Sequence, residues 1–273
     1  MNEERDKFSY AVIGHAMAAH RELGPGLDEI FYHELVAAKL KAAGIPHRFK
    51  PRGRLLHREI LADEFEADLI VGDEPGESLG VEFKVLWGDF APDHFTQTIC
   101  YVKFWQLRAA LLLDFGKESL IQKRIVFTEP PRDYDASALL QNVPTFVTHR
   151  ETLKQIAESV ARVIREHGPG YRDTTYRGLL AAELQAAGAP FAREPLTAVR
   201  TAGRLVGEAR LPCLVVSGHC GVLVTALRET RCAADRAVLQ TCLKHLGLPW
   251  GLVINFGKRT ADCHLVAPPG SPR

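Results

Sequence analysis

Residues 66–86, EADLIVGDEPGESLGVEFKVL, contain two short apolar strands separated by a turn rich in glycine, proline and acidic residues. Side chains alternate across a strand, so Glu82 and Lys84 of the second strand point to one face while Phe83 points to the other. If the two strands pair through the turn, Asp68 at the start of the first strand lies beside the charged face. The stretch therefore predicts two carboxylates and an ammonium group in an otherwise apolar sheet.

This combination is typical of a divalent-metal site for phosphodiester chemistry. A hard cation such as Mg²⁺ binds one or two carboxylates and completes its coordination shell with waters and substrate phosphate. A neighbouring lysine can orient the attacking water or help to deprotonate it. Asp68 and Glu82 are accordingly the predicted ligands of Mg²⁺ or Mn²⁺, with Lys84 beside the nucleophile.

The E-x-K triplet also has a simpler interpretation. Glutamate and lysine are common residues, and charged side chains on a solvated strand edge protect it from aggregation. The apolar neighbours Val81, Phe83 and Val85 favour instead a strand that is covered on both faces. Buried charges in such a strand need partners or a metal.

Further motifs stand on either side of the two strands. Upstream, Gly26, Glu29 and Tyr32 have the spacing G-x-x-E-x-x-Y; downstream, Gln97 and Tyr101 have the spacing Q-x-x-x-Y. Over residues 9–128 this order of motifs closely resembles the GxxExxY family of the PD-(D/E)xK nuclease-like superfamily. The resemblance implies an α/β fold of restriction-endonuclease-like type, an α-β-β-β-α-β core in which a mixed sheet is flanked by helices.

The resemblance also implies a role for each matching residue. Asp68 and Glu82 would be the principal metal ligands, and Glu29 would be a helix acid that binds the metal directly or through water. Lys84 would be the catalytic lysine. One departure is visible, because the proline that names the superfamily is replaced by Ala67.

The downstream motif is assigned in the same way. Gln97 and Tyr101 lie one helical turn apart and therefore on one face of a helix. By resemblance they would position the nucleic acid or orient the catalytic residues.

An internal repeat indicates that the unit is present twice. GPG at 24–26 recurs at 168–170, AAGIP at 42–46 recurs as AAGAP at 186–190, and LLLDFG at 111–116 recurs as LVINFG at 252–257. A period this long indicates duplicated domains and not a solenoid. The sequence thus predicts two tandem domains: residues 1–135 with intact motifs, a linker region at 136–150, and residues 151–273 as a degenerate copy.

The second copy has lost the charged residues of the first. The positions of Asp68, Glu82, Lys84 and the downstream pair are filled by apolar or neutral residues: Cys213, Leu223, Thr225, Val238 and Cys242. Only Asp173 and Tyr176 keep the character of Glu29 and Tyr32. The fold evidently does not require charges on these strands. A function, and not the fold, therefore explains the charges of the first copy. The second copy is predicted to be catalytically inactive.

Net charge divides along the same boundary. Residues 1–150 carry 18 Lys and Arg against 23 Asp and Glu, whereas residues 151–273 carry 16 against 10. The basic half could hold a phosphate backbone, or it could be an ordinary solvated surface. Opposite charges would also help the copies to pack on each other as an intramolecular pseudo-dimer. The arginines of the basic half include Arg193, Arg200, Arg204, Arg210, Arg228, Arg231 and Arg236.

Composition favours a soluble cytoplasmic protein without membrane association. Hydrophobic residues make up 46% and charged residues 25%, no apolar run approaches the length of a membrane span, and the first residues are acidic and polar. The six cysteines lack C-x-x-C spacing and are predicted to be reduced and mostly buried, which does not favour zinc at His219–Cys220 or Cys263–His264. For Trp87 and Trp105, core packing is favoured over base stacking.

The leading functional prediction is a metal-dependent nuclease that acts on DNA or RNA with its active site in the first copy. A nucleic-acid-binding or regulatory protein without turnover, built on a nuclease-like scaffold, is the main alternative. Hydrolysis of a smaller phosphodiester is a third.

Overall fold

The computed structural model describes residues 7–132, 134–226, 233–257 and 260–270. Arg228, Arg231 and Cys232, which entered the sequence predictions, lie outside these residues.

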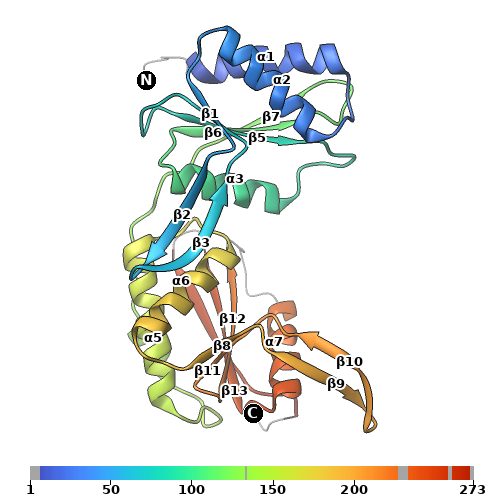
Figure 1. The fold of residues 1–273 in the computed structure, drawn as a ribbon. Helices are drawn as coiled ribbons and strands as arrows, with labels where there is room; N and C mark the ends of the chain where they lie inside the picture. Colours follow the sequence, from blue (N-terminus) through green and yellow to red (C-terminus); the bar gives the residue numbers. More distant parts are fainter. Residues whose placement is uncertain (1–6, 133, 227–232, 258–259, 271–273) are drawn as a thin grey trace. The chain divides into compact units, whose positions relative to one another are not determined.

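The chain forms two compact units (Figure 1). The first comprises Met1–Leu55 and Glu64–Thr128, and the second comprises Leu56–Asp63 and Glu129–Arg273. Residues 56–63 therefore belong to the second unit although they interrupt the first in sequence. The limits predicted from sequence at residues 135 and 150 remain predictions.

The first unit is built on a five-stranded mixed sheet in the order β1-β4-β5-β6-β7. The pair β5/β6 is parallel and the other neighbours are antiparallel. β5 and β6 are almost wholly buried, which explains their nearly continuous apolar sequence. The strands are β1 (His47–Phe49), β4 (Leu69–Val71), β5 (Leu79–Lys84), β6 (Ala109–Asp114) and β7 (Ile121–Ile125).

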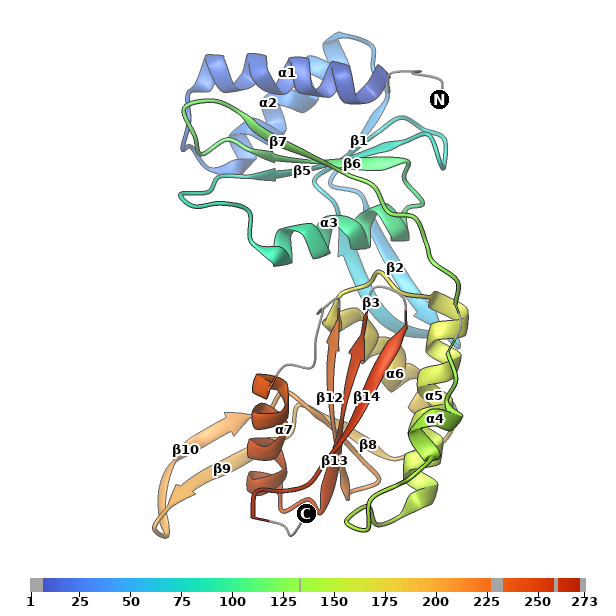
Figure 2. The same ribbon diagram turned by 180° about the vertical axis from the view of Figure 1, so that it is seen from behind.

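Helices cover both faces of this sheet (Figures 1 and 2). α1 (Lys7–Leu23) and α2 (Glu29–Ala42) lie on one face, and α3 (Pro92–Phe104) lies on the other. The main core fills the space between the α1/α2 layer and the sheet. A separate two-stranded hairpin is formed by β2 (Arg52–His57) and β3 (Ile60–Glu66).

The second unit repeats this architecture. Its five-stranded sheet has the order β8-β11-β12-β13-β14, again with one parallel pair, β12/β13, among antiparallel neighbours. Two mixed α/β sheets with flanking helices confirm the predicted fold class. The strands are β8 (Phe191–Arg193), β11 (Leu214–Val216), β12 (Cys220–Ala226), β13 (Trp250–Phe256) and β14 (Ala261–Val266).

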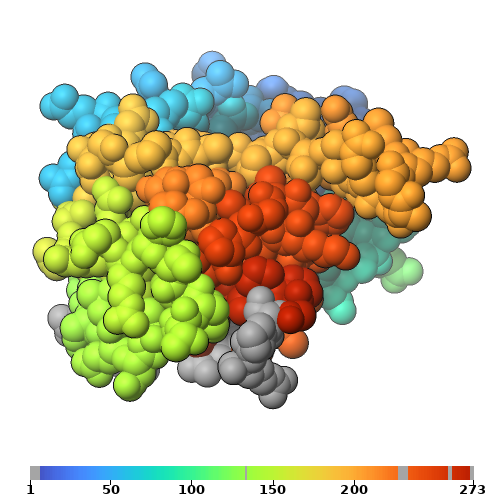
Figure 3. Space-filling model, turned by 90° about the horizontal axis from the view of Figure 1, so that it is seen from below, coloured from blue at the N-terminus to red at the C-terminus, as the bar shows by residue number. Residues whose placement is uncertain are grey.

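Apart from the short helix α4, the remaining elements of the second unit also have counterparts in the first. α5, α6 and α7 correspond to α1, α2 and α3, and the β9–β10 hairpin corresponds to β2–β3. The tip of β9–β10 stands clear of the other elements of its unit (Figures 2 and 3). The bounds are α4 (Ser137–Leu140), α5 (Arg150–His167), α6 (Asp173–Ala186), α7 (Ala233–Leu246), β9 (Leu196–Thr201) and β10 (Arg204–Arg210).

The duplication extends to individual hydrogen bonds. The hydroxyl of Tyr32 donates to the carbonyl oxygen of Gly24 at 2.6 Å, and that of Tyr176 donates to Gly168 at 2.7 Å. Both glycines have positive φ, 75° and 60°, which their missing side chain permits. The tyrosine of the G-x-x-E-x-x-Y motif is therefore a structural tie between a helix and the turn before it, kept in both units.

Candidate functional site

The register of two strands places the first pair of predicted ligands side by side. β4 and β5 are antiparallel with Leu69 opposite Val81, and one further step along both strands brings Asp68 opposite Glu82. Val81 and Phe83 are buried in the core beneath α1 and α2. Because side chains alternate, Glu82 faces the opposite layer, which α3 covers.

Hydrogen bonds hold three of the charged groups in one cluster. Lys84 Nζ donates to Glu82 Oε1 at 2.6 Å. The backbone N–H of Phe83 donates to Asp68 Oδ2 at 3.0 Å, which ties the Asp68 carboxylate to β5. The structure thus brings together Asp68, Glu82 and Lys84 as strand alternation predicts.

Glu29 enters from the first turn of α2, followed by His33, a residue that is not part of the sequence motifs. Glu29 Oε1 accepts a hydrogen bond from the backbone N–H of Val85 at 3.2 Å, just beyond the end of β5. His33 lies one helical turn later on the same face of α2, with Nε2 3.6 Å from Asp68 Oδ2. The i, i+4 spacing of Glu29 and His33 is the signal that could have identified it.

Burial shapes the charge of the cluster. It lowers the pKa of His33, against the opposing attraction of Asp68 and Glu29, so His33 is neutral at neutral pH. Burial alone would also lower the pKa of Lys84, but Glu82, Glu29 and Asp68 together outweigh it and raise that pKa, so Lys84 is an ammonium group.

Glu82 is the most perturbed acid of the cluster. Its side chain is 3% exposed, and burial, followed by repulsion from Asp68, raises its pKa to about 8. Among the described residues no donor bonds to its Oε2. Two carboxylates that crowd each other, one with an oxygen lacking a donor, suit a divalent cation, which would take the place of the proton. The residues present therefore fit a Mg²⁺ or Mn²⁺ ion.

The downstream pair lies on α3, the layer that Glu82 faces. Gln97 Nε2 donates to the hydroxyl of Tyr101 at 2.9 Å, and the Tyr101 ring contacts Phe65 and Trp105 edge-on. The pair therefore acts as one hydrogen-bonded unit braced by aromatic packing. Its role in positioning nucleic acid stays a prediction.

A further buried acid, Asp114 on β6, lies in register with Lys84. Its Oδ1 accepts hydrogen bonds from the backbone N–H groups of Leu86 and Gly116, both at 2.9 Å. These bonds hold the chain that leaves β5 against the chain that leaves β6. Asp114 therefore has a structural role in holding these two segments together. The second copy has the polar residue Asn255 in its place.

The prediction that Trp87 packs in the core is wrong. Its side chain is 94% exposed, three residues beyond Lys84, whereas Trp105 packs among aromatic rings as expected. In the same part of the unit an open depression of about 640 Å³ is lined by residues that include Phe90, Phe95, Lys117 and Lys123. The lining also includes Asp89 and Glu118, and Trp87 is not part of it. An exposed indole is suited to stacking on a nucleobase.

In the second unit the corresponding positions form a neutral, largely buried set. Cys213, Leu223, Thr225 and Cys242 are all buried. A thiol–thiol contact with Cys242 and burial raise the pKa of Cys213 far above its usual range. Asp173, the acid retained on the helix, is the first residue of α6, and its Oδ1 accepts a hydrogen bond from the backbone N–H of Thr174 at 2.8 Å. The described residues at these positions contain no pair of carboxylates for a hard cation.

Comparisons with known proteins identify the architecture twice in the chain. A family model described as the PD-(D/E)XK nuclease superfamily matches residues 6–125 and, separately, residues 150–265, in agreement with two tandem copies. No curated protein matches the chain. The crystal structure of SSO0001 matches with a TM-score of 0.31 and 16% sequence identity, over 50% of this chain and 69% of that one. Within the described parts of the chain, no helix combines the length and apolar character required to cross a bilayer.

Proposed function

Because the chain belongs to the PD-(D/E)XK nuclease superfamily, we propose that its first unit is a divalent-metal-dependent nuclease that hydrolyses phosphodiester bonds of DNA or RNA. The observation that supports this most directly is the buried carboxylate pair of Asp68 and Glu82 beside the Lys84 ammonium. A strand pair that needed only stability would not place a Glu82 oxygen without a donor next to a second carboxylate.

Within the superfamily we assign the chain to the GxxExxY family. The spacing of Gly26, Glu29 and Tyr32 supports this assignment. The hydrogen bond from the backbone N–H of Val85, just beyond the end of β5, to the Glu29 carboxylate also supports it. The second unit is proposed to be a degenerate copy, because its strand positions carry no charged residue.

Each side chain of the cluster has a distinct task in this proposal. Asp68 and Glu82 would hold Mg²⁺ or Mn²⁺, with Glu29 in support, and the ion would supply Lewis-acid polarisation of the phosphate and a more acidic water. His33, being neutral, would add no positive charge beside the ion. Lys84 remains an ammonium group, so it would orient the attacking water or bond to a phosphoryl oxygen and not act as the base.

The proposal is tested by incubating the protein with linear, circular and single-stranded DNA and RNA in Mg²⁺ or Mn²⁺. We expect cleavage of at least one substrate, and a loss of about two orders of magnitude or more in the Lys84→Ala variant, since an ammonium group at the phosphate contributes several kcal/mol. Wild-type protein that cuts none of the substrates, or a Lys84→Ala variant of undiminished rate, would contradict the proposal.

Trp87 is expected to contribute to substrate binding by stacking on a base. Trp87→Ala should weaken single-stranded nucleic-acid binding about 5- to 100-fold, because base–aromatic stacking is worth about 1–3 kcal/mol. Tyr10→Ala provides a matched control, since Tyr10 is another strongly exposed aromatic residue, 78% exposed on α1. Equal affinities of the two variants, measured by fluorescence anisotropy, would remove Trp87 from the binding surface.

A second candidate, nucleic-acid binding without turnover, is favoured by one feature of the second unit. The projecting β9–β10 hairpin carries the exposed arginines Arg200, Arg204 and Arg210, with Glu208 as the exposed acid on β10. Such a ribbon can follow a phosphate backbone. Salt-sensitive binding with no cleavage of any substrate in the same assay would favour this candidate over the nuclease.

A further inference from the structure

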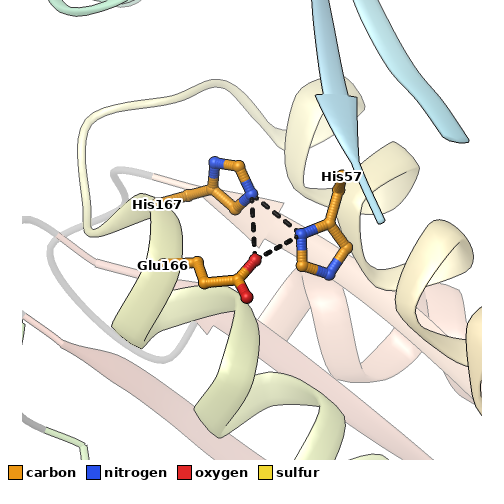
Figure 4. A group of neighbouring side chains, drawn as sticks. All are labelled: His57, Glu166 and His167. Carbon is orange, nitrogen blue, oxygen red and sulfur yellow. Dashed lines mark hydrogen bonds and ion pairs between the residues drawn. The ribbon is translucent and has the colours of Figure 1, made fainter. Parts of the chain in front are cut away.

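Three side chains of the second unit converge on one point (Figure 4). His57 ends strand β2 in the segment Leu56–Asp63, and Glu166 and His167 end helix α5. His57 Nδ1 lies 2.8 Å from Glu166 Oε2 and 3.0 Å from His167 Nε2, and the latter two atoms are 3.9 Å apart. Neither the nuclease proposal nor the family's motifs involve these residues.

The other side of the His57 ring is occupied by a carboxylate. His57 Nε2 lies 2.6 Å from Glu183 Oε2, and both groups are buried. Arg58 Nε donates to the same Glu183 oxygen at 3.2 Å, and Arg162 Nε donates to Glu183 Oε1. With Nε2 directed at the Glu183 carboxylate, Nδ1 is the ring nitrogen of His57 that faces Glu166 and His167.

We propose that His57, Glu166 and His167 bind a divalent transition-metal ion, Zn²⁺ or one of similar preference. Bonds of about 2.0–2.1 Å to tetrahedral ligands place the ligand atoms about 3.3 Å from one another. The three observed separations of 2.8, 3.0 and 3.9 Å lie on both sides of that value. Two imidazoles and one carboxylate form a ligand set of the Zn²⁺ type, with a fourth position left for water.

The surroundings of His57 and Glu166 are typical of metal ligands. A ligating histidine usually donates its second N–H to a carboxylate, which fixes the orientation of the ring, and Glu183 does this for His57. Arg58 lies near the other Glu166 oxygen, Oε1, at 3.6 Å, which leaves Oε2 to face the histidines. Glu166 is 45% exposed, so an ion and its water can enter from solvent.

The backbone near His57 supports a specialised role for this hairpin tip. Arg58 and Glu59, which form the turn between β2 and β3, both have positive φ, 51° and 63°. The equivalent turn of the β9–β10 hairpin has Ala202 and Gly203, and glycine adopts this conformation at less cost. Arg58 adopts this less favourable backbone conformation, and its guanidinium donates a hydrogen bond to Glu183 at 3.2 Å. The metal would complete this anchorage by joining the hairpin tip to α5.

The proposal is tested by titrating metal-free, full-length protein with Zn²⁺ in excess Mg²⁺. Mg²⁺ prefers oxygen ligands and keeps its waters, so it would occupy the Asp68–Glu82 site without competing for two imidazoles. We expect one Zn²⁺ per chain by calorimetry. Co²⁺ in place of Zn²⁺ should give strong visible d–d absorption, as expected for a four-coordinate site.

Glu166→Gln and His167→Asn should each weaken Zn²⁺ binding by about a hundredfold or more and remove the Co²⁺ absorption, because each deletes a direct ligand. Glu158→Gln is the matched control, since Glu158 lies on the same helix and is ion-paired to Arg162. Circular dichroism of the metal-free variants checks that each is folded. Absence of Zn²⁺ binding would overturn the proposal, and so would Zn²⁺ binding that is unchanged in both ligand variants, because the ion would then lie elsewhere.

Discussion

The Glu82→Gln variant is expected to lose cleavage by about three orders of magnitude or more, while its folded state becomes more stable at pH 8. The loss follows because glutamine keeps the shape of the side chain but removes the negative charge that a hard cation requires. A loss of this size corresponds to about 4 kcal/mol of transition-state stabilisation.

The gain in stability follows from the raised pKa of Glu82, about 8 in the folded protein. The folded state keeps a proton on Glu82 that the unfolded chain releases near pH 4.5, so the metal-free wild type loses stability as the pH rises from there to about 8. Glutamine has no such titration. We therefore expect the variant to be more stable by roughly 1–3 kcal/mol above pH 8, with little difference at pH 4.

Denaturant unfolding at pH 4 and pH 8.5, with and without Mg²⁺, measures both effects. Mg²⁺ should stabilise the wild type at pH 8.5 and leave Glu82→Gln unchanged. Glu34→Gln, on the exposed side of α2, is the control that should match the wild type throughout. A Glu82→Gln variant that still cleaves at the wild-type rate would move the active site away from this cluster.

The Gly178→Ala variant is expected to be strongly destabilised, by about 2 kcal/mol or more. A Cβ atom at this position in α6 would lie 1.9 Å from the carbonyl oxygen of Ala62 in β3, and backbone cannot yield as a flexible side chain does. Glycine in the middle of a helix ordinarily gains about 0.5–1 kcal/mol on replacement by alanine. The close approach of the hairpin therefore reverses the usual sign.

Gly14→Ala in α1 is the control, because nothing lies within 4 Å of its added Cβ, and it should stabilise the protein. Gly178→Ala should also weaken Zn²⁺ binding, since displacement of Ala62 moves the hairpin tip that carries His57. Denaturant unfolding of both variants, with Zn²⁺ titration of the folded fraction, checks these effects. A stabilised Gly178→Ala variant would show that the backbone of Ala62 does not pack against Gly178 of α6.

Strand alternation explains why the Asp68, Glu82 and Lys84 cluster could be predicted. Adjacent strands joined by a short turn leave few registers, and the period of two residues then decides which side chains share a face. His33 belongs to no motif, and its i, i+4 spacing from Glu29 becomes informative only once Glu29 is placed at the site. Trp87 was misjudged because an apolar residue next to an apolar strand resembles a core residue until the end of the strand is known.

From the sequence, comparison of the two copies shows the duplication and the loss of charge in the second copy, and strand alternation brings Asp68, Glu82 and Lys84 together. The mixed-sheet fold and the place of Glu29 are implied by the resemblance to the GxxExxY family. The proton that Glu82 retains depends on burial, which only packing sets. The joining of His57 to Glu166 and His167, across 110 residues between the two histidines, was likewise decided by tertiary structure alone. No local pattern encodes it, because it arises from the seating of a hairpin tip on α6, where Gly178 leaves room for the backbone of β3.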